Sequence, residues 1–180
     1  MNKKLNNMLI KLVSPAIIIL GIILFSGAVV FADFTGEESF LSHLRYSVKI
    51  TLSASVNRSG KKVSLEKAGS IRPGEIIDWK IISHNVGKGP ARGYKATGKI
   101  PVGTEFVAGS AKADGAVAIR YSVDKGKSFS EKPMVSKKQA DGSKKLVSAS
   151  ADMYTQVQFV WRDPLNAGKK LNAFYSVRVK

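Results

Sequence analysis

The sequence contains no cysteine and only two histidines among its 180 residues. Disulfide bonds and cysteine-ligated zinc sites are therefore excluded, and the fold must be stabilised by backbone pairing and a hydrophobic core. The two histidines, His43 and His84, lie in different segments, whereas a zinc site needs three or four ligands. The sequence thus predicts no metal site and no cofactor.

Motifs for catalysis are also missing. The chain has no G-x-S-x-G nucleophile motif, no phosphate-binding loop and no D-x-D-x-D run for calcium. Glycoside hydrolysis needs two carboxylates that act as a pair. The candidates here are scattered along the chain, namely Asp78, Glu105, Asp152 and Asp163. We therefore expect a protein that is not an enzyme, and a hydrolase is the disfavoured alternative.

Acidic residues are few: 13 Asp and Glu stand against 29 Lys and Arg, which gives a formal net charge of +16. After residue 45 no basic run exceeds two residues, and the pairs are Lys61-Lys62, Lys137-Lys138, Lys144-Lys145 and Lys169-Lys170. Such a surface either attracts anionic polymers or an anionic membrane surface, or simply keeps the domain soluble. Net charge relates only loosely to partners, so we favour the second interpretation and keep the first as an alternative.

The N-terminal segment has the pattern of a secretory signal. Lys3, Lys4 and Lys11 precede an uncharged apolar run over residues 16–30, and Ala32 ends a short cleavage-site pattern before Asp33. We expect residues 1–32 to be a signal peptide, whose removal lowers the net charge from +16 to +13 because only those three lysines are lost. The alternative is an uncleaved anchor that contacts the membrane through residues 12–31. Both place the remaining chain outside the cytoplasm, in the periplasm, on the cell surface or secreted.

From residue 46 onwards apolar residues recur at every second position, which is typical of half-buried strands. The period is clear in residues 46–52, 76–84, 116–123, 156–161 and 171–180. In residues 46–52 the apolar side chains are expected to face the core, as is Trp79, since a buried indole supplies a large contact area. Trp161 closes the alternating segment 156–161. Residues 136–150 are polar, rich in lysine and aperiodic, which predicts a long exposed loop.

No segment after residue 45 has a convincing helical stripe. About eight short strands separated by turn signals predict an all-β domain in which two sheets pack face to face as a β-sandwich. We expect this domain to span residues 46–180 and a flexible leader to span residues 33–45.

Residues 73–110 resemble the conserved-repeat domain (DUF11) of bacterial surface proteins. The family's pattern is a Pro-Gly-acid turn, an alternating aromatic strand, an Asn-x-Gly loop and a Pro-x-Gly-Thr turn. The matching positions are Pro73, Gly74, Glu75, Trp79, Asn85, Gly87, Pro101, Gly103, Thr104, Phe106, Gly109 and Ser110. The end of the chain, with Leu165 and Gly168, is similar to the family's final turn, so the resemblance covers about residues 46–180.

This resemblance implies an immunoglobulin-like β-sandwich of envelope and surface proteins, without enzymatic activity. The chain departs from the pattern at Lys99-Ile100, where the family usually has an aspartate, so an ion-pair or metal role of that residue is not carried over. Each matched residue also has a purely structural interpretation, as part of a turn or of the core, which we favour.

A shorter motif, Ser122 to Phe129, is similar to the Asp-box hairpin S-x-D-x-G-x-[ST]-[WF]. Asp124 is expected to accept backbone N–H groups across the turn, Gly126 to adopt a positive φ, and Phe129 to pack into the core. One copy predicts a hairpin and carries little information about function.

We therefore expect a structural or interaction module of the cell envelope or surface that acts as an adhesin, scaffold or assembly subunit. Its partners would be other envelope proteins or further copies of itself, with strand 46–52 pairing to a neighbouring sheet edge. A soluble polyanion-binding protein is the main alternative, and an envelope hydrolase is disfavoured. Tyrosines interleaved with basic residues leave a minor alternative, a face that stacks bases or sugars; they are Tyr94, Tyr121, Tyr154 and Tyr175.

Overall fold

The structure is a computed structural model that describes residues 45–180. The predicted signal peptide with its cleavage site between Ala32 and Asp33, the alternative anchor over residues 12–31 and the leader up to residue 44 lie outside the described residues. Within residues 45–180 no helix has the length and hydropathy to cross a membrane. The helical element of this part is a single 3₁₀ turn, Ala151–Met153.

The prediction of an all-β chain is confirmed, although residues 45–180 form eleven strands where about eight were expected. All strand pairs are antiparallel. The strands are β1 (Val48–Arg58), β2 (Lys61–Ser64), β3 (Ile76–Asn85), β4 (Lys95–Lys99), β5 (Thr104–Phe106), β6 (Lys112–Ala113), β7 (Val117–Ser122), β8 (Met134–Lys138), β9 (Lys144–Ser148), β10 (Gln156–Trp161) and β11 (Lys170–Val179).

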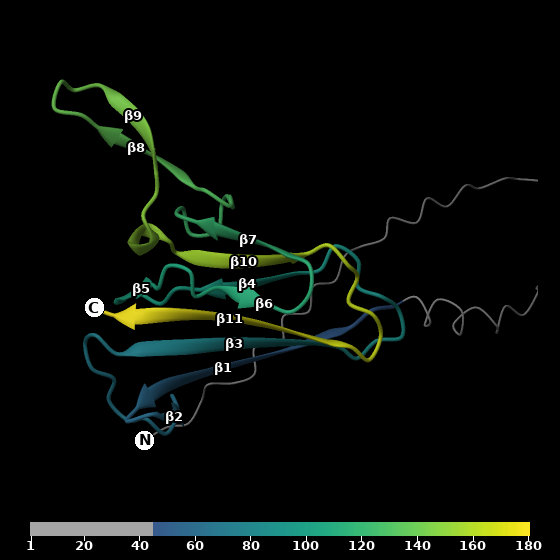
Figure 1. Cartoon of the computed structure of the whole chain (residues 1–180). Coiled ribbons are helices and arrows are strands. Elements are labelled where there is room, and N and C mark those ends of the chain that lie inside the picture. Colours follow the sequence, from purple (N-terminus) through teal and green to yellow (C-terminus); the bar gives the residue numbers. More distant parts are fainter. Residues whose placement is uncertain (1–44) are drawn as a thin grey trace, which may run out of the picture. The chain divides into compact units, whose positions relative to one another are not determined.

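The strands form three sheets, which can be followed in Figure 1. The largest has the order β2-β1-β3-β11-β5, with the short β6 also paired to β11. The second has the order β4-β10-β7, and the third is the β8–β9 hairpin. Strand β3 is central to the largest sheet, because it pairs with β1 on one side and with β11 on the other.

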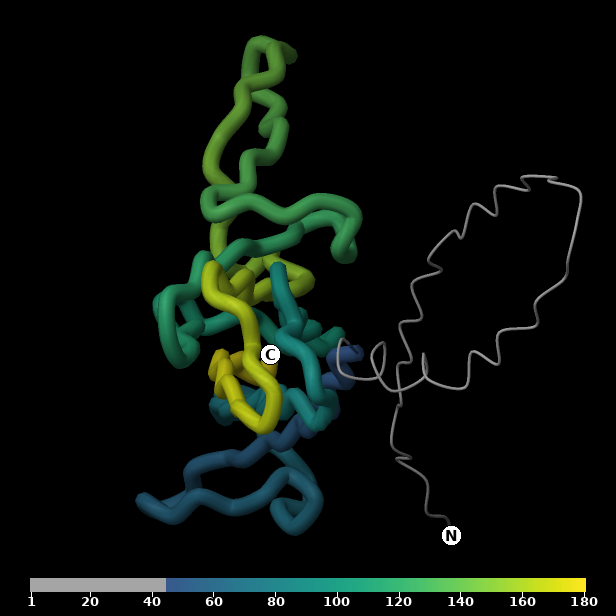
Figure 2. Tube along the Cα trace, turned by 90° about the vertical axis from the view of Figure 1, so that its right-hand side faces the viewer, coloured from purple at the N-terminus to yellow at the C-terminus, as the bar shows by residue number. Residues whose placement is uncertain are grey.

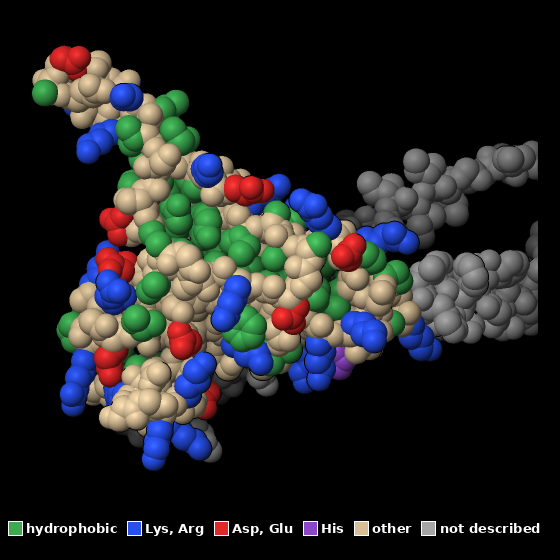
Figure 3. Space-filling view, in the orientation of Figure 1, with side chains coloured by type: hydrophobic (Ala, Val, Ile, Leu, Met, Phe, Trp, Pro, Cys, Tyr) green, Lys and Arg blue, Asp and Glu red, His purple; other side chains and the backbone are tan. Residues whose placement is uncertain are grey.

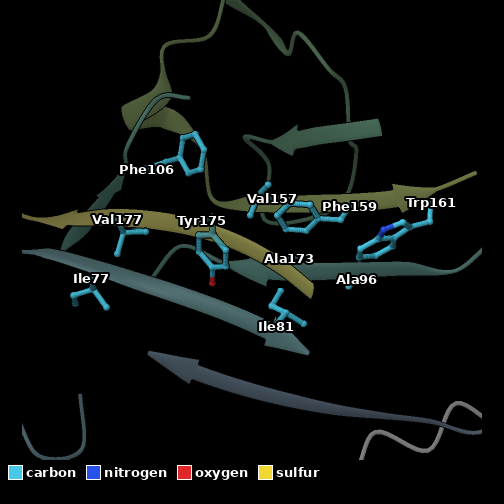
Figure 4. Close-up of a cluster of buried hydrophobic side chains, with 10 residues drawn as sticks. All are labelled: Ile77, Ile81, Ala96, Phe106, Val157, Phe159, Trp161, Ala173, Tyr175 and Val177. Carbon is cyan, nitrogen blue, oxygen red and sulfur yellow. The ribbon is translucent and has the colours of Figure 1, made fainter. Parts of the chain in front are cut away.

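The hydrophobic core lies between the six-stranded sheet and the three-stranded sheet. Figure 4 shows side chains of β3 and β11 pointing toward those of β10 and β4. Ten buried residues make up this cluster: Ile77, Ile81, Ala96, Phe106, Val157, Phe159, Trp161, Ala173, Tyr175 and Val177. Their alternation along each strand follows from strand geometry, in which successive side chains point to opposite faces. The predicted period of two therefore identifies the core face of β3, β10 and β11 correctly.

Residues 46–52 differ from the prediction that their apolar side chains face the core. Tyr46, Ile50 and Leu52 are 59%, 54% and 54% exposed. Leu52 lies opposite Ile81 of β3 and Ile50 opposite Ser83, so both side chains project from the core face of the sheet. The core cluster nevertheless contains no buried residue of β1 among the described residues, and β1 lies beyond the cluster in Figure 4. The second sheet is too narrow to cover the first half of this strand, and that is why Ile50 and Leu52 stay in solvent, whereas Val56 further along the strand is buried.

The segment 136–150, predicted to be a long exposed loop, is largely a hairpin. Strands β8 and β9 pair from Met134↔Ser148 to Lys138↔Lys144, and the turn between them contains Asp141-Gly142. The prediction of exposure is correct, because most residues of both strands are exposed. Figures 1 and 2 show the hairpin extending away from the other two sheets. Since neither face is buried, no apolar period marks these strands in the sequence.

Candidate functional site at the edge of strand β1

Asn85 of the Asn-x-Gly motif is fully buried and joins three segments of the chain. Its side-chain amide donates hydrogen bonds to the carbonyl oxygens of Gly89 and Leu165, each at 2.8 Å. Its Oδ1 accepts hydrogen bonds from the amides of Gly87 at 3.0 Å and Ser47 at 3.3 Å. The side chain thereby makes four hydrogen bonds in a site without solvent. Asn85 thus links the Asn-x-Gly loop to the entry of β1 and to Leu165.

Gly87 lies against the segment that leads into β1. A Cβ atom at this position would collide with the backbone of Arg45, Tyr46 and Ser47. Three further amides bind the same segment: Val86 N donates to Ser47 O at 2.7 Å, and Lys88 N and Gly89 N donate to Arg45 O at 3.1 and 3.2 Å. The Asn-x-Gly loop therefore fixes the point at which the chain enters the edge strand, a role that the sequence did not reveal.

The Pro73-Gly74-Glu75 turn is held by Arg58 at the end of β1. Arg58 donates from Nε and Nη2 to the two carboxylate oxygens of Glu75, at 2.8 and 3.0 Å, and also binds the carbonyl oxygens of Ala68 and Ser70. The Arg58 guanidinium, helped by the Arg72 amide, lowers the pKa of Glu75 to about 2. Gly74 adopts a φ of 84°, as this turn requires.

The Pro101-x-Gly103-Thr104 motif forms a turn at the start of β5. The amide and the hydroxyl of Thr104 both donate to Pro101 O, at 3.1 and 2.7 Å. Gly103 has a φ of 83°, and its carbonyl oxygen accepts a hydrogen bond from the Lys180 amide at 2.9 Å. This motif therefore ties the last residue of the chain to the fold and leaves no side chain arranged for chemistry.

The Asp-box segment, for which the sequence predicts a hairpin, forms a tight turn closed by a single bridge between Tyr121 and Ser130, without a second strand. The Ser128 amide donates to Asp124 Oδ1 at 2.9 Å, and the Gly126 amide donates to Ser122 Oγ at 2.8 Å. Gly126 has a φ of 89°. Hydrogen bonds from the hydroxyl and amide of Ser128, and then from Ser122, hold the pKa of Asp124 far below its ordinary value. The prediction for Phe129 is wrong: its side chain is half-buried and lies outside the core cluster.

Both tryptophans contact the core. Trp161 is buried and donates from Nε1 to Asp114 O at 2.7 Å, while its ring stacks on Tyr94 at 5.5 Å. Trp79 is half-buried and stacks on Tyr175 at 6.2 Å. Its Nε1 atom is buried and has no hydrogen-bond partner among the described residues. Of the four tyrosines noted in the sequence, Tyr175 lies within the core cluster, and Tyr94, Tyr121 and Tyr154 are half-buried against it.

Two of the scattered carboxylates meet at one surface hollow. Glu105 and Asp152 both border it, together with Arg178, whose Nη1 lies 3.7 Å from Glu105. A hydrogen bond from the Ser150 side chain lowers the pKa of Asp152, whereas a general acid needs a raised one. Within residues 45–180 no cluster of three or more His, Asp or Glu side chains is arranged to bind a metal ion.

The edge of β1 is the strongest candidate site for interaction. Strand β3 pairs with β1 over Val48–Val56, whereas β2 covers the opposite edge only over Ser55–Arg58. No strand of the described part pairs with that edge from Val48 to Ser53, a length of about 20 Å at about 3.3 Å per residue. This stretch presents main-chain donors and acceptors to any strand that approaches it.

The side chains along this open edge are of two kinds. Ile50 and Leu52 project from the core face, and both are more than half exposed. Lys49, Thr51 and Ser53 project from the other face. Lys49 is the one charge between Val48 and Ser53, and the stretch has no proline to block pairing.

Comparison of the chain with protein-family models, with curated proteins and with solved structures found no match.

Proposed function

We propose that the chain is a non-enzymatic assembly or scaffold module of a bacterial cell envelope or surface, and that it associates through the open edge of β1. The observation that carries this proposal is the stretch Val48–Ser53, whose outer edge pairs with no strand of the described residues and which has two exposed aliphatic side chains on one face. Soluble proteins usually protect such an edge with charges, proline or a bulge, because it can pair with another chain. An edge that carries only one such feature within the described residues, Lys49, is best explained by a partner strand.

The proposal includes an immunoglobulin-like β-sandwich as the fold of residues 46–180. Two sheets of antiparallel strands with a shared core support it. The resemblance of residues 73–110 to the conserved-repeat domain supports it as well, because Gly74 and Gly103 adopt the positive φ that the motif turns need. A deuterium-exchange map in which β3, β10 and β11 are the most protected strands is the expected result for such a core.

The proposal also places the domain outside the cytoplasm. Its support is the basic, then apolar, then small-residue pattern of residues 1–32. Expression in a bacterial host followed by N-terminal sequencing of the exported protein should give Asp33 as the first residue. A chain that retains residues 12–31 would instead indicate an anchored protein, and a chain found only in the cytoplasm would contradict export.

A second copy of the chain fits the edge geometrically. In an antiparallel pairing with its two-fold axis at Thr51, Ile50 of each copy lies opposite Leu52 of the other, and Lys49 lies opposite Ser53. The aliphatic side chains then form one four-residue cluster, no like charges are opposed, and Thr51 pairs with Thr51. The six-stranded sheets of the two copies would join into one continuous sheet.

The test is the oligomeric state of the exported chain by analytical ultracentrifugation over a range of concentrations. The double substitution Ile50→Lys with Leu52→Lys places lysines opposite each other across the proposed contact, so a dimer should revert to a monomer. The matched control is Val102→Lys with Met153→Lys, which adds the same two charges at exposed apolar positions away from β1. A wild-type monomer at all concentrations, or equal loss of the dimer in both variants, would contradict self-association.

A different envelope protein is the other partner that this edge admits. In that case the wild-type chain stays monomeric, and cross-linking from Ser53→Cys in cells captures a heterologous partner that the double lysine variant loses. Capture of no partner and no second copy at this position would argue against the edge as a contact.

A further inference from the structure

The β8–β9 hairpin carries an arrangement of charge that the fold does not explain. Lys137 lies directly opposite Lys145 in the strand register, and Lys138 lies directly opposite Lys144. Directly opposed residues have Cβ atoms about 5 Å apart, and like charges at that separation destabilise a hairpin. Two pairs of ammonium groups thus lie at one end of an exposed two-stranded ribbon, one pair on each face.

No salt bridge in the described part of the chain involves these lysines. The nearby Asp141 uses its Oδ1 to accept hydrogen bonds from the amide and hydroxyl of Ser143, at 2.9 and 2.7 Å. Three of the lysines, Lys137, Lys138 and Lys145, border a surface hollow of about 390 Å³ at this end of the hairpin.

The hairpin also contributes little to the stability of the domain. Its strands pair only with each other, and both are mostly exposed. Figures 1 and 3 show it standing clear of the packed sheets, with Lys or Arg side chains on its surface. An isolated two-stranded hairpin is at best marginally stable in water. The opposed lysine charges therefore lower the stability of an element that is only marginally stable without them. An anionic ligand would remove this repulsion.

We propose that the β8–β9 hairpin is a binding site for a flexible, linear polymer of phosphate groups that is recognised by charge alone. The site is built from lysine and contains no arginine, and lysine acts on phosphate as a hydrated point charge without the planar, paired geometry of a guanidinium. Residues 134–148 contain no aromatic side chain, so neither bases nor sugar rings find a stacking platform. A polymer such as inorganic polyphosphate or poly(glycerol phosphate) meets these conditions, and a nucleic acid has no feature here that its bases would use.

The experiment measures binding of labelled inorganic polyphosphate to the exported chain by fluorescence anisotropy at several salt concentrations. The test variant replaces Lys137, Lys138, Lys144 and Lys145 by glutamine. The matched control replaces four exposed lysines outside the hairpin, Lys61, Lys62, Lys169 and Lys170, and so has the same net charge. We expect the hairpin variant to bind at least about tenfold more weakly at low salt, with the salt slope reduced by about 2 to 3, and the control to retain most of the affinity.

Three results would overturn the proposal: no binding by the wild-type chain, equal loss of affinity in the two variants, or tighter binding of single-stranded DNA than of polyphosphate at equal charge. Repeating the measurement with poly(glycerol phosphate) separates the two polymer sources. The unfolding midpoint of the hairpin variant should match that of the wild type, since the hairpin lies outside the core. The oligomeric state of the hairpin variant should also be unchanged, so this proposal and the proposed assembly through β1 succeed or fail separately.

Discussion

Arg58 binds both carboxylate oxygens of Glu75, at 2.8 and 3.0 Å, across seventeen residues of sequence. The same guanidinium also donates hydrogen bonds to the carbonyl oxygens of Ala68 and Ser70. One side chain therefore holds together the two ends of segment 58–75, which contains β2. The acidic position of the Pro-Gly-acid motif thus anchors the loop between β2 and β3 to the end of β1.

This pair predicts how stability depends on pH. The pKa of Glu75 is lowered to about 2 in the folded chain, from an ordinary value of 4.5. A depressed folded pKa means that the stabilisation is present above the unfolded value and is lost as the pH falls from about 5 to 2. Urea unfolding of Glu75→Gln should therefore show a weaker decrease over this range than the wild type. Glu66→Gln, at an exposed position, is the control and should follow the wild-type curve.

Asn85 should be the most sensitive polar position of the described chain. Replacing it by alanine leaves the buried carbonyl oxygens of Gly89 and Leu165 without their donor, and we expect the free energy of unfolding to fall by about 2 to 4 kcal/mol. Chemical denaturation measures this loss, and Asn57→Ala on the exposed part of β1 should change stability by less than about 0.5 kcal/mol. An equal effect at the two positions would contradict the role of Asn85 as a junction.

The same substitution should loosen the entry into β1. The Ser47 amide loses its acceptor when Asn85 is replaced, so hydrogen exchange at Ser47 and at its neighbours should accelerate more than exchange in β10.

Gly98 allows the ring of Tyr175 to lie against β4. A Cβ atom at this position would collide with Cε1 of the buried ring, whose hydroxyl donates to Lys99 O at 2.8 Å. The loss of unfolded-state entropy in Gly98→Ala favours folding by less than about 1 kcal/mol, whereas overpacking costs about 1 to 3 kcal/mol. We expect a net loss of stability, measured by thermal unfolding. Thr97→Ala, at an exposed neighbour, should be nearly neutral, and a stabilised Gly98→Ala would show that the ring moves freely.

Ser122 is the buried member of the Asp-box turn. Its hydroxyl oxygen accepts the Gly126 amide at 2.8 Å, so Ser122→Ala removes that acceptor and should lower stability by about 1 to 2 kcal/mol. The Gly126 amide should exchange faster in this variant. Substitution of the exposed Ser136 by alanine serves as the control, and comparable destabilisation by both changes would contradict the role of the turn.

The sequence predicts the strands whose alternating apolar pattern matches the alternation of buried and less buried side chains in the structure. Strand β10 alternates strictly between buried and half-buried residues, and Val157, Phe159 and Trp161 can be assigned to the core from the pattern alone. The turns at Gly74 and Gly126 can also be predicted, because glycine readily adopts the positive φ that these turn positions need.

What sequence reasoning misses depends on residues far away in the chain. The exposure of Ile50 and Leu52 is set by the width of the opposing sheet, which β1 itself does not encode. The partners of Asn85 include Leu165, eighty residues away. The β8–β9 hairpin has no buried face and hence no period, and only its Asp141-Gly142 turn signal distinguishes it from a loop.

Strands β1 and β11 both run antiparallel to β3, so the described chain enters the six-stranded sheet at the Asn85 end of β3 and leaves it at the Ile76 end. A pulling force applied between these two points is directed along the strands. The nine residue pairs on each side of β3 then bear the load together in shear, instead of opening one after another. A module inserted in this way between a cell and its attachment would resist tension with the whole length of its central strand.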